Sequence, residues 1–287
     1  MSTAVKARDV SKKVPAFRKI SSPIRANAPV NRGQFRDFDP KRTPPSDFAP
    51  ESKVAQHGWK RALDLTCIFV SLPFTLPLMI LIVLWVRIVS RGPALFRQER
   101  IGQNGKRFVL YKFRSMKMNA GTSRHETYLR HLVRSDSPMI KLDLLCDSRL
   151  IPGGCFLRAA GLDELPQLLN VLRGEMSLVG PRPCLPQEFG YFSERQRERF
   201  AALPGLTGKW QVSGKNQTTF SEMNVMDIRY VREASLGLDL SIMLRTPAAL
   251  FVQMCQAFQQ DRSARQTVSY RESAHKPAPG CGSRRLS

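Results

Sequence analysis

One apolar run dominates the pattern of hydrophobic and polar positions, and it extends from Leu65 to Val86. About 20 apolar residues suffice for a helix to cross the hydrocarbon core of a bilayer, so the run predicts a membrane helix. Pro73 and Pro77 lie in its middle, where a proline removes a helix hydrogen bond and kinks the axis. Basic residues flank the run on both sides: Lys60, Arg61, Arg87 and Arg91.

The flanks and the central prolines together favour a re-entrant membrane helix over residues 57–92. Positively charged flanks tend to stay on the cytoplasmic side of a membrane, and here both flanks and the long remainder of the chain are basic. A helix that enters the inner leaflet, turns near the prolines and returns keeps both flanks on that side. A kinked single span with the rest of the chain outside is one alternative, and a buried core helix is another.

A β-hairpin is predicted between Ala94 and Met116. Asn104-Gly105 is a strong turn signal, and strand-forming residues lie on both sides of it. In the second strand Lys112 and Arg114 alternate with aromatic side chains, so the two cations share one face. That face is compatible with a cationic site and equally with an ordinary half-exposed strand.

Residues 158–183 hold the most informative polar pattern. Asp163 and Glu164 stand just before Pro166, and apolar residues then recur at roughly helical spacing. A proline fits the first turn of a helix, so the two acids are predicted at a helix N-terminus, where ionised carboxylates are favoured. A capped amphipathic helix with two solvated acids would give the same pattern.

Two arginines bracket this acid pair in sequence. Arg158 precedes it, and Arg182 stands between two prolines in Gly180-Pro181-Arg182-Pro183, which suggests a side chain held in place. An ionised aspartate beside a second acid, with arginines near, suits a phosphoryl or pyrophosphate site. Such a site needs a nucleophile, a metal ligand and cationic clamps.

The C-terminal half contains weaker signals. Ser193 is a plausible N-cap for a short charged helix over residues 193–203. The glycine-rich segment 204–216 can bring backbone N–H groups close to a ligand or can simply form turns. Residues 242–258 are apolar and contain Pro247, which suits either the membrane interface or the core.

Composition narrows the class of partner. The 287 residues carry a formal charge of +22, so the chain should seek polyanions such as nucleotides, anionic lipid or nucleic acid. The six cysteines form no CxxC pair, which favours a reducing, cytoplasmic setting without a disulfide framework or zinc site. Residues 1–56 are basic and lack an apolar core, so we expect a disordered tail rather than a cleavable signal peptide.

Taken together, these segments resemble the bacterial sugar transferases, the monotopic polyprenyl-phosphate phosphoglycosyl transferases. The resemblance covers roughly residues 58–255. The matching segments are, in order, Lys60-Arg61-x-x-Asp64, Pro77, Tyr111-Lys112-Phe113-Arg114-Ser115-Met116, Leu162-Asp163-Glu164-Leu165-Pro166-Gln167, Met176-Ser177-Leu178-Val179-Gly180-Pro181-Arg182-Pro183 and Pro204-Gly205-Leu206-Thr207-Gly208.

The resemblance implies a reaction and a location. The family transfers a sugar 1-phosphate from a UDP-sugar to undecaprenyl phosphate and releases UMP, as the first membrane step of exopolysaccharide, capsule or glycoconjugate synthesis. It implies a re-entrant helix in the bacterial inner membrane, with the catalytic domain on the cytoplasmic face. Membrane lipid is an expected partner and nucleic acid is not. The oligomeric state stays open.

The resemblance further implies roles for particular residues. Asp163 would be the nucleophile that forms a phosphoglycosyl-aspartate, and Glu164 would be catalytic and would bind Mg2+. The remaining candidates are predicted to contact the substrate: Lys112, Arg158, Arg182, Gln211, Lys215, Asn216 and Asp227. Of these, Asp227 is open to either a structural or a metal-side role.

The predicted fold class is α+β: a mostly helical, membrane-associated catalytic domain with a β-hairpin and an N-terminal re-entrant helix. The expected domains are a disordered basic tail over 1–56, the membrane helix over 57–92, the transferase domain over 93–258 and a disordered tail over 259–287. A non-catalytic basic protein that attaches to membranes or binds nucleic acid is the alternative, motivated by the net charge.

Overall fold

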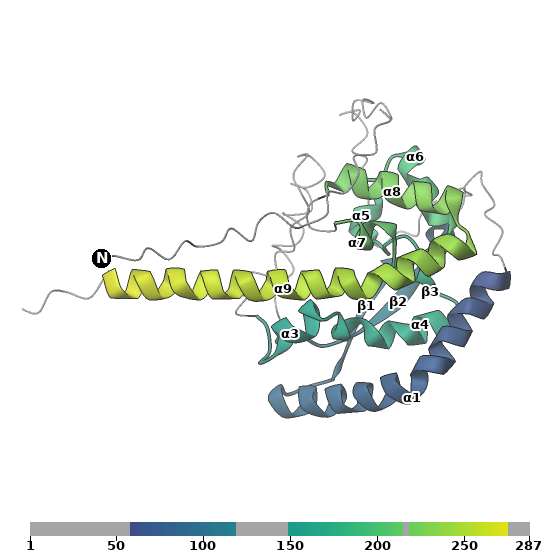
Figure 1. Ribbon diagram of the computed structural model, residues 1–287. Helices are drawn as coiled ribbons and strands as arrows, with labels where there is room; N and C mark the ends of the chain where they lie inside the picture. Colours follow the sequence, from purple (N-terminus) through teal and green to yellow (C-terminus); the bar gives the residue numbers. More distant parts are fainter. Residues whose placement is uncertain (1–57, 119–148, 215–217, 275–287) are drawn as a thin grey trace, which may run out of the picture. The chain divides into compact units, whose positions relative to one another are not determined.

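The computed structural model describes residues 58–118, 149–214 and 218–274, with the backbone alone at 258 and 260–274. All of these residues belong to one compact unit, Phe38–Ser287. The described part is mostly helical and contains two small sheets, one antiparallel and one parallel (Figure 1). The prediction of a mixed, mostly helical fold with a β-hairpin is therefore confirmed, and the parallel pair adds to it.

Helix α1 (Gly58–Val89) contains both central prolines and bends along its length (Figure 1). A bend is expected because Pro73 and Pro77 cannot donate backbone hydrogen bonds. Near the prolines, the Thr75 hydroxyl donates to the carbonyl of Ser71 at 3.1 Å. The predicted apolar run is thus one bent helix rather than two separate ones.

Side chains toward each end of α1 are buried, while its middle is exposed. Ile68 packs against a core cluster of Phe108, Leu110, Val171 and Met176, and Ile82 and Val86 pack near the other end with Ala94, Phe113, Ile151 and Leu157. Large apolar side chains between these ends face outward: Phe69, Val70, Leu72, Phe74, Leu76, Leu78, Ile80 and Leu81. Within the described part of the chain, two helices are long and apolar enough to cross a membrane, Gly58–Val89 and Leu236–Ala257.

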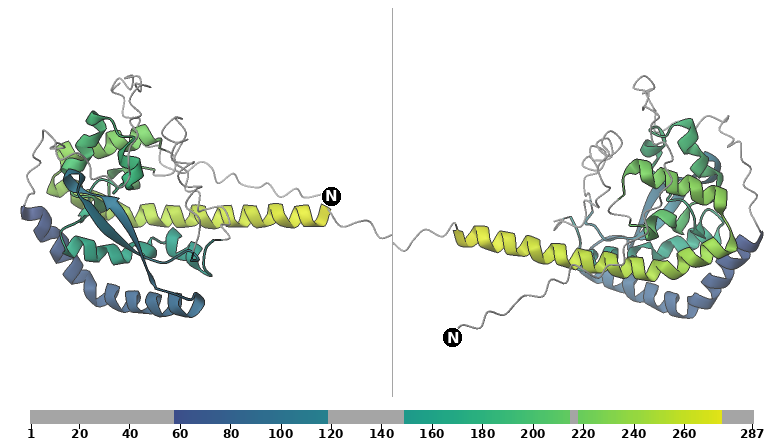
Figure 2. Two further views of the ribbon diagram at one scale, coloured as in Figure 1. Left: turned by 180° about the vertical axis from the view of Figure 1, so that it is seen from behind. Right: turned by 45° about the horizontal axis from the view of Figure 1, so that its top comes forward.

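The predicted hairpin is present as β1 (Leu95–Ile101) and β2 (Arg107–Phe113), which pair antiparallel with Leu95 opposite Phe113 (Figure 2). A single 3-10 turn, η2 (Gln103–Gly105), joins them. Asn104 and Gly105 both have positive φ, 53° and 72°, and the Lys106 N–H donates to the carbonyl of Gln103 at 3.0 Å. This is the turn that Asn-Gly favours, because asparagine and glycine tolerate the left-handed region best.

A second, parallel pair joins two short strands, β3 (Ser177–Val179) and β4 (Gly205–Thr207). Glycines allow the backbone of the 205–208 segment to contact the backbone at Gly180, which follows β3. A Cβ on Gly205 would lie 2.0 Å from the backbone nitrogen of Gly180, and one on Gly208 would lie 2.2 Å from the Gly180 carbonyl oxygen. Gly205 and Gly208 of the 204–216 segment therefore serve close backbone packing.

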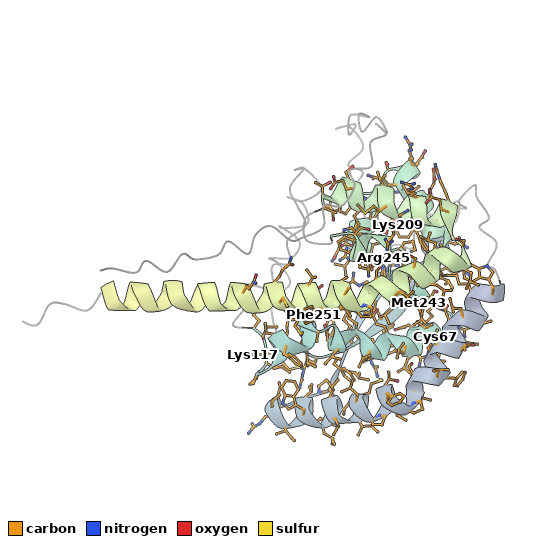
Figure 3. All side chains as sticks on the ribbon, viewed as in Figure 1. Cys67, Lys117, Lys209, Met243, Arg245 and Phe251 are labelled. Atoms are coloured by element: carbon orange, nitrogen blue, oxygen red, sulfur yellow. The ribbon has the colours of Figure 1, made fainter. Side chains whose placement is uncertain are left out.

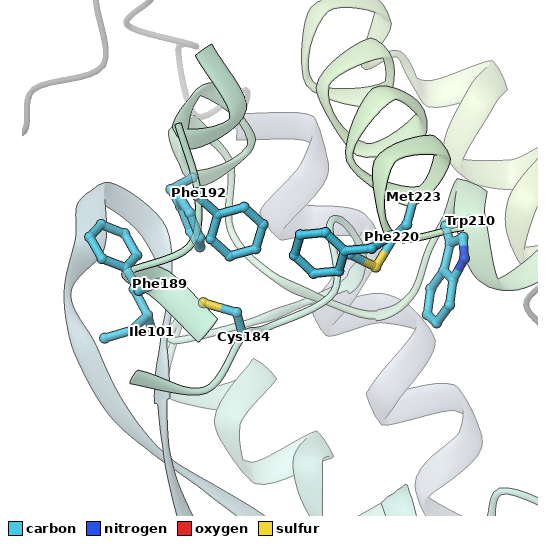
Figure 4. Close-up of a cluster of buried hydrophobic side chains, with 8 residues drawn as sticks. Ile101, Cys184, Phe189, Phe192, Trp210, Phe220 and Met223 are labelled. Carbon is cyan, nitrogen blue, oxygen red and sulfur yellow. The ribbon is translucent and has the colours of Figure 1, made fainter. Parts of the chain in front are cut away.

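Short helices surround these sheets: α3 (Gly154–Ala159), η4 (Leu162–Gln167), α4 (Leu168–Leu172), α5 (Pro186–Phe189), α6 (Glu194–Arg197), η5 (Glu198–Ala201), α7 (Lys209–Val212) and α8 (Phe220–Glu233). Ser193 caps α6, as predicted, by accepting from the Gln196 N–H. An aromatic core holds α5, η5 and α8 together, with Phe189 and Phe192 both within 6 Å of the Phe200 ring (Figure 4).

Helix α9 (Leu236–Ala274) passes through Pro247 and extends well past residue 258, where the predicted disordered tail begins. Residues 259–274 are rich in Gln, Arg, Ala and Ser, of which the first three are good helix formers, so the helix can propagate through them. Leu244 and Phe251 on α9 are 81% and 62% exposed (Phe251 is labelled in Figure 3). The apolar residues of 242–258 are thus only partly used for the core.

Candidate active site

Asp163 and Glu164 lie in the first turn of η4, and α4 follows η4 without a break. Gly161 precedes the turn with φ of 70°, a conformation that suits glycine, and its carbonyl accepts from the Glu164 N–H at 3.1 Å. Asp163 is buried, whereas Glu164 is partly exposed. The predicted position of both acids at the start of a helix is confirmed, although that helix is a 3-10 turn.

Lys112 from β2 meets this acid pair. Its Nζ lies 2.8 Å from Glu164 Oε1, and both side chains remain partly exposed. Strand β2 runs directly beside η4, so the hairpin supplies a cation to the start of the helix. The structure therefore brings together two residues that the sequence separates by 52 positions.

Asn170 fixes β2 against the helix that follows η4. Its side-chain oxygen accepts from the Tyr111 N–H at 3.2 Å, and its nitrogen donates to the Val109 carbonyl at 2.7 Å. The same nitrogen donates to Glu175 at 2.6 Å, and Asn170 is fully buried. This residue satisfies the free edge of β2 and thereby holds Lys112 beside Glu164.

Arg182 lies between β3 and α5, where its side chain contacts two groups. Its Nη1 is 3.6 Å from Glu188 Oε1, and its guanidinium lies 6.0 Å from the centre of the Trp210 ring. Glu188 is itself buried and accepts from the Leu185 N–H at 2.8 Å. The arginine is thus held in place, as the flanking prolines suggest.

Asp227 from α8 supports the Arg182 backbone. Its Oδ2 lies 2.5 Å from Arg199 Nη2 and 3.4 Å from the backbone nitrogen of Arg182, and Arg199 donates to the Arg182 carbonyl at 2.9 Å. Burial raises the pKa of the Asp227 carboxyl, and Arg199 partly offsets this. These contacts are those of a structural acid that positions the arginine segment.

The remaining predicted residues lie in α3, in α7 or outside the described residues. Arg158 lies in the last turn of α3, which packs against η4, and is partly exposed. Gln211 in α7 donates to the Leu206 carbonyl at 3.2 Å. Lys215 and Asn216 lie outside the described residues.

Three residues beside this site were not found from the sequence: Asn170, Arg199 and Arg100. Asn170 and Arg199 act through partners that are far away in sequence, so no local pattern marks them. Arg100, by contrast, could have been found from the predicted register of the hairpin. The Asn104-Gly105 turn places Arg100 opposite Phe108 and Phe96 opposite Lys112, so Arg100 and Lys112 share a face of the hairpin.

The fold and site together define a class of protein. An acid pair lies beside cationic side chains, and the same folded unit contains a helix that is long and apolar enough to cross a membrane. A model of the bacterial sugar transferase family matches residues 55–253. Because this match covers more than half of the chain, the protein belongs to the bacterial sugar transferase family.

Individual relatives agree with this assignment. The chain is 39% identical to the undecaprenyl-phosphate galactose phosphotransferase of Salmonella typhimurium, over 68% of this chain and 41% of that protein. It is 40% identical to the UDP-glucose:undecaprenyl-phosphate glucose-1-phosphate transferase of Caulobacter vibrioides, over 70% and 73%. It is 35% identical to the exopolysaccharide production protein ExoY of Sinorhizobium fredii, over 67% and 84%. The chain thus spans about two fifths of the Salmonella relative and most of the other two.

Proposed function

We propose that this protein transfers a sugar 1-phosphate from a UDP-sugar to undecaprenyl phosphate and releases UMP, as the first membrane step of exopolysaccharide, capsule or glycoconjugate synthesis. The observation that carries the proposal is the Lys112–Glu164 ion pair beside buried Asp163. The names of two relatives describe undecaprenyl-phosphate transferases for galactose and for glucose, which supports the same class of substrates here.

The proposed chemistry has two displacements at one phosphorus atom. An oxygen of Asp163 attacks the phosphorus that bears the sugar, the bond to the UMP oxygen breaks, and UMP leaves. An oxygen of undecaprenyl phosphate then attacks the phosphoglycosyl-aspartate, and the Asp163 carboxylate is released. Such transfers need mainly positioning and charge neutralisation, which Lys112, Arg158 and Arg182 would supply.

Glu164 is the proposed ligand of Mg2+, and Asp163 stands next to it. Among residues 58–118, 149–214 and 218–274, no group of three or more His, Cys, Asp or Glu side chains could hold a metal ion. Two neighbouring acids fit Mg2+, which proteins usually bind through one or two carboxylates together with substrate phosphates. Bound there, the ion would neutralise diphosphate charge.

A re-entrant membrane helix is the proposed topology, and it is supported by the contacts of α1. Near its start, Asp64 accepts from the Ser177 hydroxyl at 3.0 Å and the Leu178 N–H at 2.9 Å. Near its end, a Cβ on Gly153 would lie 2.5 Å from the Trp85 ring, so the ring contacts the glycine directly. Both ends therefore reach one folded unit, which we place on the cytoplasmic face of the inner membrane.

UMP release tests the proposed reaction. Purified protein in detergent is given undecaprenyl phosphate, Mg2+ and a panel of UDP-sugars that includes UDP-glucose and UDP-galactose. Asp163→Asn should abolish release while membrane association persists, and Glu99→Gln, which changes a half-exposed acid on β1, should leave release unchanged. If Asp163→Asn released UMP at the wild-type rate, Asp163 could not be the nucleophile.

Cysteine labelling tests the topology separately. Gly58→Cys lies at the first residue of α1 and Met118→Cys lies beyond its last, and both positions are exposed. A membrane-impermeant thiol reagent should reach both only from the cytoplasmic side. Labelling of one position from outside intact cells would show a single span instead.

A further inference from the structure

Arg100, near the end of β1, lies beside the candidate active site without having been predicted there. The backbone of its neighbour Ile101 pairs with Cys184, just after the Arg182 segment, through a 2.9 Å hydrogen bond from the Ile101 N–H. Arg100 Nη1 lies 3.4 Å from the Pro183 carbonyl oxygen. The end of the hairpin is thus fixed to the segment that carries Arg182.

The guanidinium of Arg100 has few partners for its five donors. Nη2 donates to Gln98 at 2.8 Å, while the contact of Nη1 with Pro183 is long for a hydrogen bond. Nε is buried and makes no hydrogen bond within the described part of the chain. A partly buried guanidinium with unused donors is poorly satisfied by protein alone, because buried polar groups normally find partners.

Charges of both signs act on Arg100. Burial lowers the pKa of Arg100 to about 10, and the nearby Arg182 guanidinium lowers it too, whereas Glu188 and Glu164 raise it. The group is still cationic at neutral pH. The two guanidiniums repel one another, Glu188 partly offsets that repulsion, and a bound anion would offset it further.

We propose that Arg100 contacts the diphosphate of the nucleotide sugar together with Arg182, as a second guanidinium on the same anion. The identity of this anion rests on the proposed function. A planar guanidinium matches phosphate oxygens with two parallel hydrogen bonds, so a lysine would not replace it fully. The UDP-sugar has two phosphates, and a pair of arginines suits a diphosphate better than a monophosphate.

Equilibrium binding of UDP and UMP tests this role without any turnover. Arg100→Ala should weaken UDP binding about tenfold or more, which corresponds to about 1.4 kcal/mol, and should weaken UMP binding less. Arg100→Lys should lose less than Arg100→Ala. Arg97→Ala is the matched control, because Arg97 stands on the same strand but lies over the Tyr111 ring on the other face of the hairpin. Its UDP affinity should stay within about twofold of the wild type.

Two results would overturn the inference: unchanged UDP affinity in a folded Arg100→Ala variant, or an equal loss in Arg97→Ala. Thermal unfolding checks the fold, and Arg100→Gln, which can keep a hydrogen bond to Gln98, takes the place of Arg100→Ala if alanine unfolds the protein. Failure of the proposed function looks different. In that case the wild type would release no UMP from any UDP-sugar, whatever the Arg100 variants do to UDP binding.

Discussion

The side chain of Asn170 and the backbone of Tyr111 are joined by a 3.2 Å hydrogen bond in which the Tyr111 N–H donates. Together with the bond from Asn170 to the Val109 carbonyl, it occupies the free edge of β2 as a neighbouring strand would. Asn170 belongs to α4, which continues η4, and Lys112 follows Tyr111 directly. One buried amide therefore sets where the cation of the hairpin meets the acid pair.

Asn170→Leu should reduce both stability and UMP release. Leucine has a similar size but removes the side-chain partner of the Tyr111 N–H and of the Val109 carbonyl. An unsatisfied group costs about 1–3 kcal/mol when buried, and less at Val109, which is partly exposed. Denaturant unfolding measures the first effect, and faster amide exchange at Tyr111 reports the lost bond independently of activity. Gln187→Leu, at an exposed position on α5, is the control. A Tyr111 amide that exchanges as slowly as in the wild type would contradict the assigned role.

Lys112→Met should separate activity from stability. The Lys112–Glu164 pair is partly exposed, so its loss should change the free energy of unfolding by less than about 1 kcal/mol. UMP release should nevertheless fall by about tenfold or more if the lysine neutralises transferred phosphate. Lys209→Met removes a comparable 3.2 Å pair with Glu233 away from the acid pair and should leave release unchanged. Equal release by the two variants would remove Lys112 from the site.

Arg199→Met should destabilise the protein strongly, by about 3–5 kcal/mol, because Asp227 would remain buried without its cation. Arg232→Met is a close control. Its pair with Glu198 has the same 2.5 Å separation but is exposed, so its loss should cost less than about 1 kcal/mol. Chemical denaturation of the two variants compares them directly. Similar losses would mean that burial does not govern the Arg199 pair.

Gly205→Ala should prevent or severely weaken folding, because the added Cβ would lie 2.0 Å from the Gly180 nitrogen, a backbone atom that cannot step aside. Gly237→Ala, near the start of α9, meets no atom within 4 Å and should be neutral or slightly stabilising. Thermal unfolding distinguishes the two. A normal melting temperature for Gly205→Ala would show that the β3–β4 junction is looser than described.

Cys184 should make stability depend on pH in the alkaline range. Burial, reinforced by Glu188, raises the pKa of the Cys184 thiol from 9.0 to about 12. Between these values the unfolded chain has lost a proton that the folded protein keeps, so the free energy of unfolding falls as pH rises from about 9 to about 12. Cys184→Ala should flatten this part of the curve, relative to Cys155→Ala at an exposed cysteine. Identical curves for the two variants would contradict the raised pKa.

Local chemistry made parts of the fold predictable. The hairpin followed from Asn104-Gly105, since few other dipeptides accept two positive φ values. The start of η4 followed from Pro166 and the acids before it. The length of α9 was harder, because a polar helix segment and a polar coil have similar composition.

The site could be predicted only in part from the sequence, because several of its contacts join residues that are far apart in the chain. The contact of Lys112 with Glu164 depends on Asn170, and the setting of Arg182 depends on Arg199 and Asp227. No spacing in the chain encodes these pairings. Sequence reasoning could therefore name the groups that carry charge but not the groups that hold them.

Trp210 gives the protein a built-in optical probe. Its indole N–H donates to the Thr218 hydroxyl at 2.6 Å, and the Arg182 guanidinium lies 6.0 Å from its ring. The chain has three tryptophans, and the other two, Trp59 and Trp85, belong to α1. Replacing both with phenylalanine would leave Trp210, beside Arg182, as the one tryptophan of the chain. Its emission would then follow the arrival of an anion at that arginine in real time, without a label.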